Sequence, residues 1–249
     1  MVTRRRREIK SSDLVLCQTL TMGKRQESRE RIEREIIEIG RRHLVTEGAA
    51  GLSVRAIARE LGMVSSAVYR YVASRDDLLT LLLIDVYTEL ADVVDRASQS
   101  TTGSWAERAL ASARAARQWA VDQPACWALL YGSPVPGYHA PAELTVGPGT
   151  RVVGALFGAV ASGIAAGDIA TSKSEAPQSM SKDFDTVRAE FAFPGDDATV
   201  LKCFLLWAAL VGAISLEVFG QYGADTLTDP AAVFDGQIGL LLATFATQN

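Results

Sequence analysis

The 249-residue sequence has few of the side chains that metal sites and disulfide frameworks require. It contains two histidines, His43 and His139, and three cysteines, and it has no C-x-x-C pair. The cysteines Cys17, Cys126 and Cys203 lie far apart, and an odd number without paired spacing is typical of a protein in a reducing compartment. The spacing of zinc ligands is absent as well. We therefore expect no disulfide framework, no metal and no cofactor.

Catalytic patterns are also missing. The sequence has no pair of candidate catalytic carboxylates, no nucleophile elbow, no phosphate-binding P-loop and no dinucleotide-binding glycine pattern. Two histidines offer little capacity for general acid–base catalysis. We predict that the protein is not an enzyme.

Secretory and membrane-spanning segments are not expected either. The arginines at residues 4–7 are followed by further charged residues rather than by an apolar run. Residues 152–167 are uncharged but shorter than the roughly 20 residues that span a bilayer. Residues 203–220 are interrupted by Glu217, so both segments fit buried helices better than membrane helices. We expect a cytoplasmic protein without a membrane partner.

The charge is distributed unevenly along the chain. The formal net charge is -4, but residues 1–80 hold 16 Lys and Arg against 11 Asp and Glu, whereas residues 81–249 hold 9 against 18. A basic first third on an acidic body fits a nucleic-acid-binding head. The alternative is a basic tail followed by a solvated helix face.

Residues 53–77 read as two short helices with a tight turn between them, followed by the start of a third helix. Ser53 is a good N-cap, Gly62 makes the turn, and Ser74 caps the helix that follows. The residues spaced to face a common core are Ala56, Ile57, Leu61, Val68 and Val72. The residues left on the outside are Ser65, Ser66, Tyr69, Arg70, Tyr71 and Arg75. A short helix with this polar, aromatic and basic surface suits the major groove of DNA.

The remaining pattern predicts an all-α protein of about nine helices without strands. We expect a basic, disordered arm over residues 1–27, a helix-turn-helix domain over 28–73, and a helical bundle over 74–249 that begins with a long connecting helix. Residues 132–149 are rich in proline and glycine and predict a loop, and residues 169–197 are polar and broken by prolines. The expected helices lie at 28–46, 53–61, 65–72, 74–97, 104–122, 124–131, 150–166, 198–222 and 229–247.

The last two expected helices predict a homodimer. Apolar residues spread around most of the helix over 198–222, and a helix of this kind must be covered on both sides. One side can pack on its own subunit and the other on a second copy, which gives a four-helix interface. The alternative is a deeply buried helix of a monomer.

The helix-turn-helix segment resembles the TetR family of transcriptional regulators. The resemblance covers residues 29–83, and the order of the helices is similar to that of the family. It is carried by Leu52, Ser53, Ile57, Ala58, Leu61, Gly62, Ala67, Val68, Tyr69, Arg70, Tyr71, Ser74, Arg75, Leu78 and Leu79. A weaker resemblance, over residues 131–138 and Trp207–Gly212, is to the C-terminal subgroup named for Trp-His-Gly. Val211 stands there in place of the histidine.

The resemblance implies which residues contact DNA. By position, the second short helix enters the major groove, Arg55 reaches bases or backbone, and Arg75 grips a phosphate. The residues that line the groove side by the same comparison are Ser65, Ser66, Ala67, Tyr69, Arg70 and Tyr71. For Tyr69 the alternative is a ring that serves the core, and for Arg70 it is a solvated charge.

The resemblance also implies a ligand-responsive repressor that binds a palindromic operator as a dimer and is released by a small, mostly apolar molecule. The candidate ligand-binding residues are Trp105, Trp119, Trp127, Tyr131, Phe157, Trp207 and Glu217. For each aromatic residue the alternative is ordinary core packing. The competing function is a global or architectural DNA-binding protein without ligand control.

Overall fold

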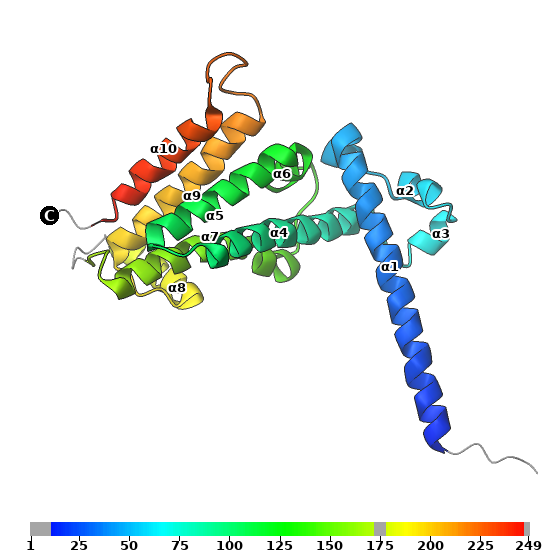
Figure 1. Ribbon diagram of the computed structural model, residues 1–249. Helices are drawn as coiled ribbons and strands as arrows, with labels where there is room; N and C mark the ends of the chain where they lie inside the picture. The colour runs from blue at the N-terminus through cyan, green and yellow to red at the C-terminus, as the bar shows by residue number, and fades with distance from the viewer. Residues whose placement is uncertain (1–10, 172–177, 247–249) are drawn as a thin grey trace, which may run out of the picture.

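The computed structural model describes residues 11–171 and 178–246, and these residues form ten helices and no strand (Figure 1). The all-α prediction is confirmed. The helices are α1 (Ser11–Gly51), α2 (Val54–Glu60), α3 (Ser65–Val68), α4 (Arg75–Ser100), α5 (Trp105–Asp122), α6 (Pro124–Tyr131), α7 (Ala142–Ala166), α8 (Gln178–Phe191), α9 (Asp197–Val218) and α10 (Pro230–Ala243).

The helices form a small head and a larger body, and α4 connects them (Figure 1). The head core is a separate cluster of buried residues from α1, α2, α3 and the first two turns of α4. The body core begins at Val86 of α4 and continues through α5, α6, α7, α8, α9 and α10. Since α4 supplies Leu78, Leu79 and Leu82 to one core and Val86 and Leu90 to the other, it belongs to both.

The caps of α4 and α5 follow directly from the sequence. The Ser74 side chain accepts a hydrogen bond from the Asp77 backbone N–H at 3.0 Å, so α4 begins where the pattern predicts. Ser104 and Glu107 form a capping box, in which each side chain bonds to the backbone of the other residue. The first cap fixes the start of α4 in the head, and the second fixes the start of α5 at the opposite end of the body.

Helix α1 starts earlier than expected. The prediction of a disordered arm over residues 1–27 is wrong for residues 11–27, because α1 begins at Ser11; residues 1–10, with the arginines at 4–7, lie outside the described residues. The segment from 11 to 27 contains no proline and a single glycine, so nothing in it interrupts a helix. The helical path is broken instead at Gly48, whose φ of 66° only glycine adopts readily.

Two further predictions in the body need correction. The expected loop over 132–149 ends at Pro141, because α7 begins at Ala142 and accommodates Pro148. The Thr150 hydroxyl donates to the Val146 carbonyl at 2.9 Å and supports the turn around this proline. The polar segment after α7 contains α8, so the described residues have one helix more than the nine expected.

Helices α9 and α10 leave a large apolar face uncovered in the single chain. Leu201, Phe204 and Leu205 of α9 are 52, 41 and 54% exposed, and Leu240 of α10 is 75% exposed. By length and composition alone, α7 and α9 would suffice to cross a membrane. In this fold both helices also contribute residues to the body core.

Candidate nucleic-acid interface and the adjoining cavity

The head presents α3 on its outer side because the turn before it is tight. The Ser53 hydroxyl accepts from the Ala56 N–H at 3.4 Å and starts α2, and Gly62, at φ 66°, turns the chain after it. Helix α3 is shorter than predicted and ends at Val68, but backbone hydrogen bonds of helical turns continue to Val72. Val68 and Val72 are buried, so the intervening residues are held at the surface.

Two arginines of this surface lack internal partners. Arg55 and Arg70 are exposed, and among the described residues neither forms a side-chain hydrogen bond or an ion pair. Three arginines of α1 differ, since Arg29, Arg31 and Arg42 pair with glutamates. An unpaired guanidinium can bind a guanine edge or a phosphate without first breaking an internal contact.

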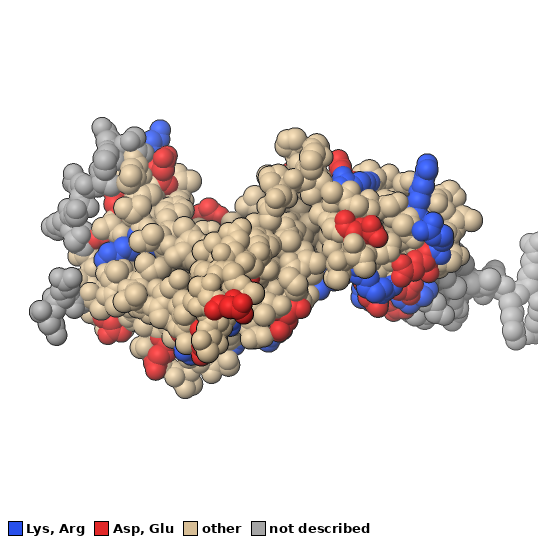
Figure 2. All heavy atoms as spheres, turned by 90° about the horizontal axis from the view of Figure 1, so that it is seen from above, with Lys and Arg blue, Asp and Glu red and all other residues tan. Residues whose placement is uncertain are grey.

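Figure 2 shows most of the visible Lys and Arg at the head end, intermixed with Asp and Glu, whereas the visible body surface is mostly uncharged with scattered side chains of both signs. Arg59, also exposed and without an ion pair among the described residues, lies one helical turn after Arg55. Sequence reasoning missed Arg59, although the four-residue spacing places both on one face of α2. We add it to the candidate DNA contacts.

The other predicted groove residues divide into two groups. Ser66 and Tyr69 are exposed, and Tyr69 retains 39% of its surface, while Ser65 and Ala67 are half-buried. Tyr71 packs partly against the head core, and the Arg29 guanidinium lies 5.6 Å from its ring centre. The Tyr71 ring therefore also supports the contact between α1 and the turn that follows α3.

Arg75 has an internal role that the sequence did not indicate. Its guanidinium donates to the carbonyl oxygens of Ala49 and Ala50, at 2.9 and 3.0 Å. These carbonyls follow the break at Gly48, at the end of α1, where helical carbonyls lack backbone partners. Arg75 thus ties the end of α1 to the start of α4, and its contact with a phosphate stays a prediction.

A polar network holds α1 against α4 and the start of α6. Arg41 pairs with Asp85 at 2.7 Å and also with Glu89, and its Nη1 donates to the Gln123 side chain at 3.3 Å. Burial raises the pKa of Glu89, but hydrogen bonds from Gln123, Trp119 and Arg41 outweigh it, and the net pKa lies below its usual value. The network therefore contains an ionised carboxylate at neutral pH.

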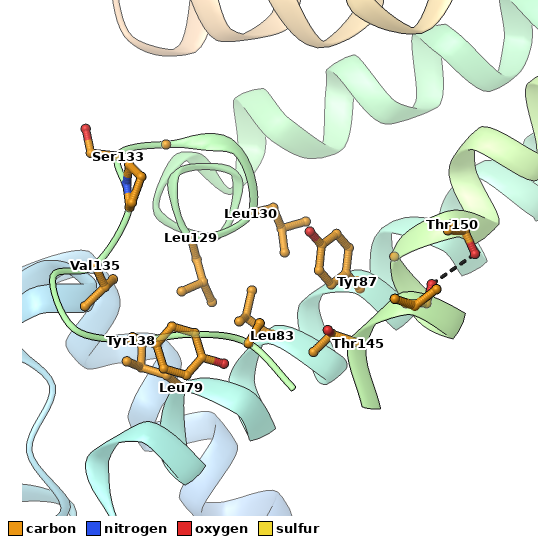
Figure 3. Close-up of a pocket in the computed structure, with 15 residues that line it drawn as sticks. Leu79, Leu83, Tyr87, Leu129, Leu130, Ser133, Val135, Tyr138, Thr145 and Thr150 are labelled. Atoms are coloured by element: carbon orange, nitrogen blue, oxygen red, sulfur yellow. Dashed lines mark hydrogen bonds between the residues drawn. The ribbon is translucent and has the colours of Figure 1, made fainter. Parts of the chain in front are cut away.

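A cavity of about 460 Å³ lies directly beside the head (Figure 3). Its walls come from α4, α6, the loop over 132–141 and the start of α7. Val135 and Tyr138 of this loop also pack against the head core, and the Tyr138 hydroxyl lies 2.8 Å from the Thr80 hydroxyl of α4. One wall of the cavity is therefore part of the head–body contact.

None of the seven predicted ligand-binding residues lines this cavity. Trp105, Trp119, Trp127 and Phe157 are at most 5% exposed and fill the body core. Large aromatic rings bury the most surface per residue, which explains why they pack between helices rather than leave space. Their role toward a ligand stays a prediction that the structure does not support.

The remaining three residues contact other side chains of the body, although the buried Tyr131 hydroxyl has no hydrogen-bond partner among the described residues. The Tyr131 ring contacts the Trp207 ring edge-on at 5.9 Å between centres. Glu217 forms a two-pronged ion pair with Arg117, whose side chain is 13% exposed. A carboxylate within an apolar helix needs such a partner. The ion pair with Arg117 therefore explains why Glu217 lies in this helix without a contact to a ligand.

The cavity residues that sequence reasoning missed come from distant parts of the chain. Tyr87 belongs to α4, Leu129 to α6, and Tyr138 to the loop that follows. Each looks like an ordinary apolar or aromatic residue in its own segment. Only the packing of α4 against α6 and α7 brings them together. Among the described residues, no cluster of His, Cys, Asp and Glu could hold a metal ion.

Comparisons with known proteins agree with this geometry. Residues 36–82 match the family described as bacterial regulatory proteins, tetR family, and residues 109–241 match the tetracyclin repressor-like C-terminal domain. The chain is 66% identical over 232 residues to the HTH-type transcriptional regulators Rv1816 of Mycobacterium tuberculosis (strain ATCC 25618 / H37Rv) and Mb1846 of Mycobacterium bovis (strain ATCC BAA-935 / AF2122/97). These matches cover 93% of this chain and 99% of each relative.

The fold is similar to the crystal structure of SCO4313, named as a regulatory protein, with a TM-score of 0.71 and 30% identity over 88% of this chain and 98% of that one. The predicted absence of enzymatic activity agrees with the family, whose members are DNA-binding regulators. The exposed, unpaired arginines of the head, the two family matches and the similarity along nearly the whole chain lead to one conclusion: the protein belongs to the TetR family of helix-turn-helix transcriptional regulators.

Proposed function

We propose that the protein is a ligand-responsive repressor that binds a palindromic operator as a homodimer and is released by a small, mostly apolar molecule. One observation carries the proposal: the wall of the cavity, at Val135 and Tyr138, is also part of the packing on the head. A molecule in the cavity would therefore change contacts that position the DNA-binding helices. A DNA-binding regulator of this kind acts in the cytoplasm.

The dimer is supported by the uncovered face of α9 and α10. The exposed apolar residues of α9 recur at helical spacing from Leu201 to Leu216, and α10, which packs against α9, exposes Val233 and Leu240. A stable interface buries about 800 Å² on each partner, and its centre is usually apolar. Two copies related by a twofold axis would pair these helices in a four-helix bundle.

Light scattering at micromolar concentration tests the dimer. We expect a mass of two chains for the native protein and of one chain for the double variant Leu201→Glu, Leu205→Glu. The matched control is Leu144→Glu, which replaces a leucine of α7 that is 50% exposed, and it should remain dimeric. A native protein that is strictly monomeric would contradict the proposal.

Selection of bound sequences from a random DNA pool tests the operator. The two recognition helices of a dimer contact half-sites one helical turn apart, about 34–36 Å. We therefore expect an inverted repeat with half-site centres about 10 base pairs apart or a multiple of one turn. Diffuse binding without a repeat would favour the global or architectural function instead.

A further inference from the structure

The cavity beside the head contains no charged side chain. Its lining consists of leucines, valines, small residues and a few hydroxyl groups, and no Lys, Arg, His, Asp or Glu is among them. A buried ion requires an opposite charge or several hydrogen bonds, and without them its transfer from water costs several kcal/mol. The lining therefore disfavours carboxylates, phosphates and amines, and it favours neutral molecules.

Most of the hydroxyl groups in the lining are already engaged. Thr145 donates to the Pro141 carbonyl and Thr150 to the Val146 carbonyl, both at 2.9 Å, and Tyr138 pairs with Thr80. Ser133 lies exposed on the loop. The two threonines have used their single O–H donor, so toward a ligand they can only accept a hydrogen bond.

Tyr87 differs from the threonines because its donor is unused, and from Ser133 because it is half-buried. Its side chain is half-buried, its ring reaches the cavity from α4, and its hydroxyl has no hydrogen-bond partner among the described residues (Figure 3). Burial, and to a smaller extent the neighbouring Tyr138, raise the pKa of Tyr87, so the phenol stays protonated at neutral pH. A protonated phenol donates one hydrogen bond and also accepts.

We propose that this cavity binds an uncharged, mainly hydrocarbon molecule whose one hydroxyl or carbonyl group pairs with the Tyr87 hydroxyl. The inference rests on the proposed function and names the chemical class of the effector. The volume of about 460 Å³ lies within the range of small-molecule sites, which is roughly 300–1,000 Å³. Leu83, Leu129 and Leu130 would contact the hydrocarbon part.

The test compares three probes that share one eight-carbon chain: 1-octanol, octanoate and octylammonium. Isothermal titration of the full-length protein at pH 8, without DNA, measures the affinity for each. We expect 1-octanol to bind and each ion to bind at least about tenfold more weakly, because neither charge finds a partner. The inference would be overturned if octanoate or octylammonium bound as tightly as 1-octanol. It would also be overturned if 1-octanol did not bind at any concentration up to its solubility.

Two variants locate the bound molecule. Tyr87→Phe should weaken 1-octanol binding by about three- to tenfold, the usual effect of one neutral hydrogen bond. Gly149→Leu should abolish it, because a Cβ at this position would lie 3.5 Å from the Tyr87 ring and the rest of the side chain would enter the cavity. Gly158→Leu is the matched control on the same helix, because a Cβ there would meet nothing within 4 Å beyond its own stretch of helix, and it should bind normally.

Native binding by both Tyr87→Phe and Gly149→Leu would place 1-octanol elsewhere and refute the site. If Gly149→Leu does not fold, as judged by circular dichroism, Tyr87→Phe and the comparison of the three probes decide the question. A parallel operator-release assay separates this inference from the proposed function. Release of the operator by octanoate but not by 1-octanol would agree with a ligand-responsive repressor but contradict the proposal that its ligand is uncharged. Tight binding of 1-octanol without release of the operator would agree with an uncharged ligand but contradict the ligand-responsive repressor.

Discussion

Replacing Arg70 by alanine should impair sequence recognition more than general DNA affinity. Arg70 is exposed and has no ion pair in the described part of the chain, so the substitution removes no internal contact. A two-pronged contact from arginine to guanine contributes about 1–3 kcal/mol of discrimination, which corresponds to roughly 5- to 150-fold in Kd. Binding to unrelated DNA should lose no more than one charge interaction, because phosphates are contacted without regard to sequence.

The assay is fluorescence anisotropy with the selected operator and with a scrambled duplex of equal length, at several salt concentrations. Arg96→Ala is the matched control, since Arg96 is also exposed and without an ion pair among the described residues, but it lies near the far end of α4. We expect Arg96→Ala to leave both affinities nearly unchanged. If Arg70→Ala weakens operator and scrambled DNA equally and a new selection returns the same preferred sequence, Arg70 does not read a base.

Three further predictions concern the contacts around the head. Arg75→Ala should lower the free energy of unfolding in urea by about 1–2 kcal/mol, because two carbonyls at the end of α1 lose a charged donor; an unchanged midpoint would contradict this. Tyr138→Phe should cost about 1 kcal/mol, and a double-mutant cycle with Thr80→Val should show coupling of similar size rather than additivity. Glu89→Gln should destabilise the protein at pH 7, but the difference from the native protein should shrink as the pH falls. The folded pKa of Glu89 is lowered, so its contribution is complete above the unfolded value of about 4.3 and is lost as the pH falls through the folded pKa. A constant difference in denaturation curves from pH 7 to pH 3 would refute this assignment.

The local features of the head could be predicted from the sequence because short-range rules determine them. Ser53 and Ser74 cap the helices that the pattern assigned to them, and Gly62 adopts the positive φ that the turn requires. The helical spacing of the apolar residues correctly predicted that Val68 is buried and Arg70 is exposed. These outcomes depend on neighbours within a few positions along the chain.

The body was harder to predict because its features depend on packing between distant segments. Pro148 and the glycines around it indicated a loop, yet α7 includes them, since the helix is supported by its contacts with α4 and α5. Aromatic residues pointed to a pocket, but Trp127 is 1% exposed within the core. The cavity forms instead where Tyr87 and Leu129 meet, and no spacing in the sequence shows this.

The position of the cavity explains how a small molecule could affect the head without a long pathway. Leu79 belongs to the head core and also lines the cavity, while Tyr87, two turns later on α4, contacts the body residue Tyr131. A hundredfold loss of operator affinity requires a free-energy difference of about 2.7 kcal/mol between the two states. Loss of one hydrogen bond such as that between Tyr138 and Thr80 contributes about 1 kcal/mol. Loss of about 70 Å² of apolar contact, at about 25 cal/mol per Å², contributes the rest. Rearrangement of the loop over 132–141 against the head is therefore sufficient in magnitude, and Tyr138→Phe should reduce the effect of a bound ligand on operator affinity.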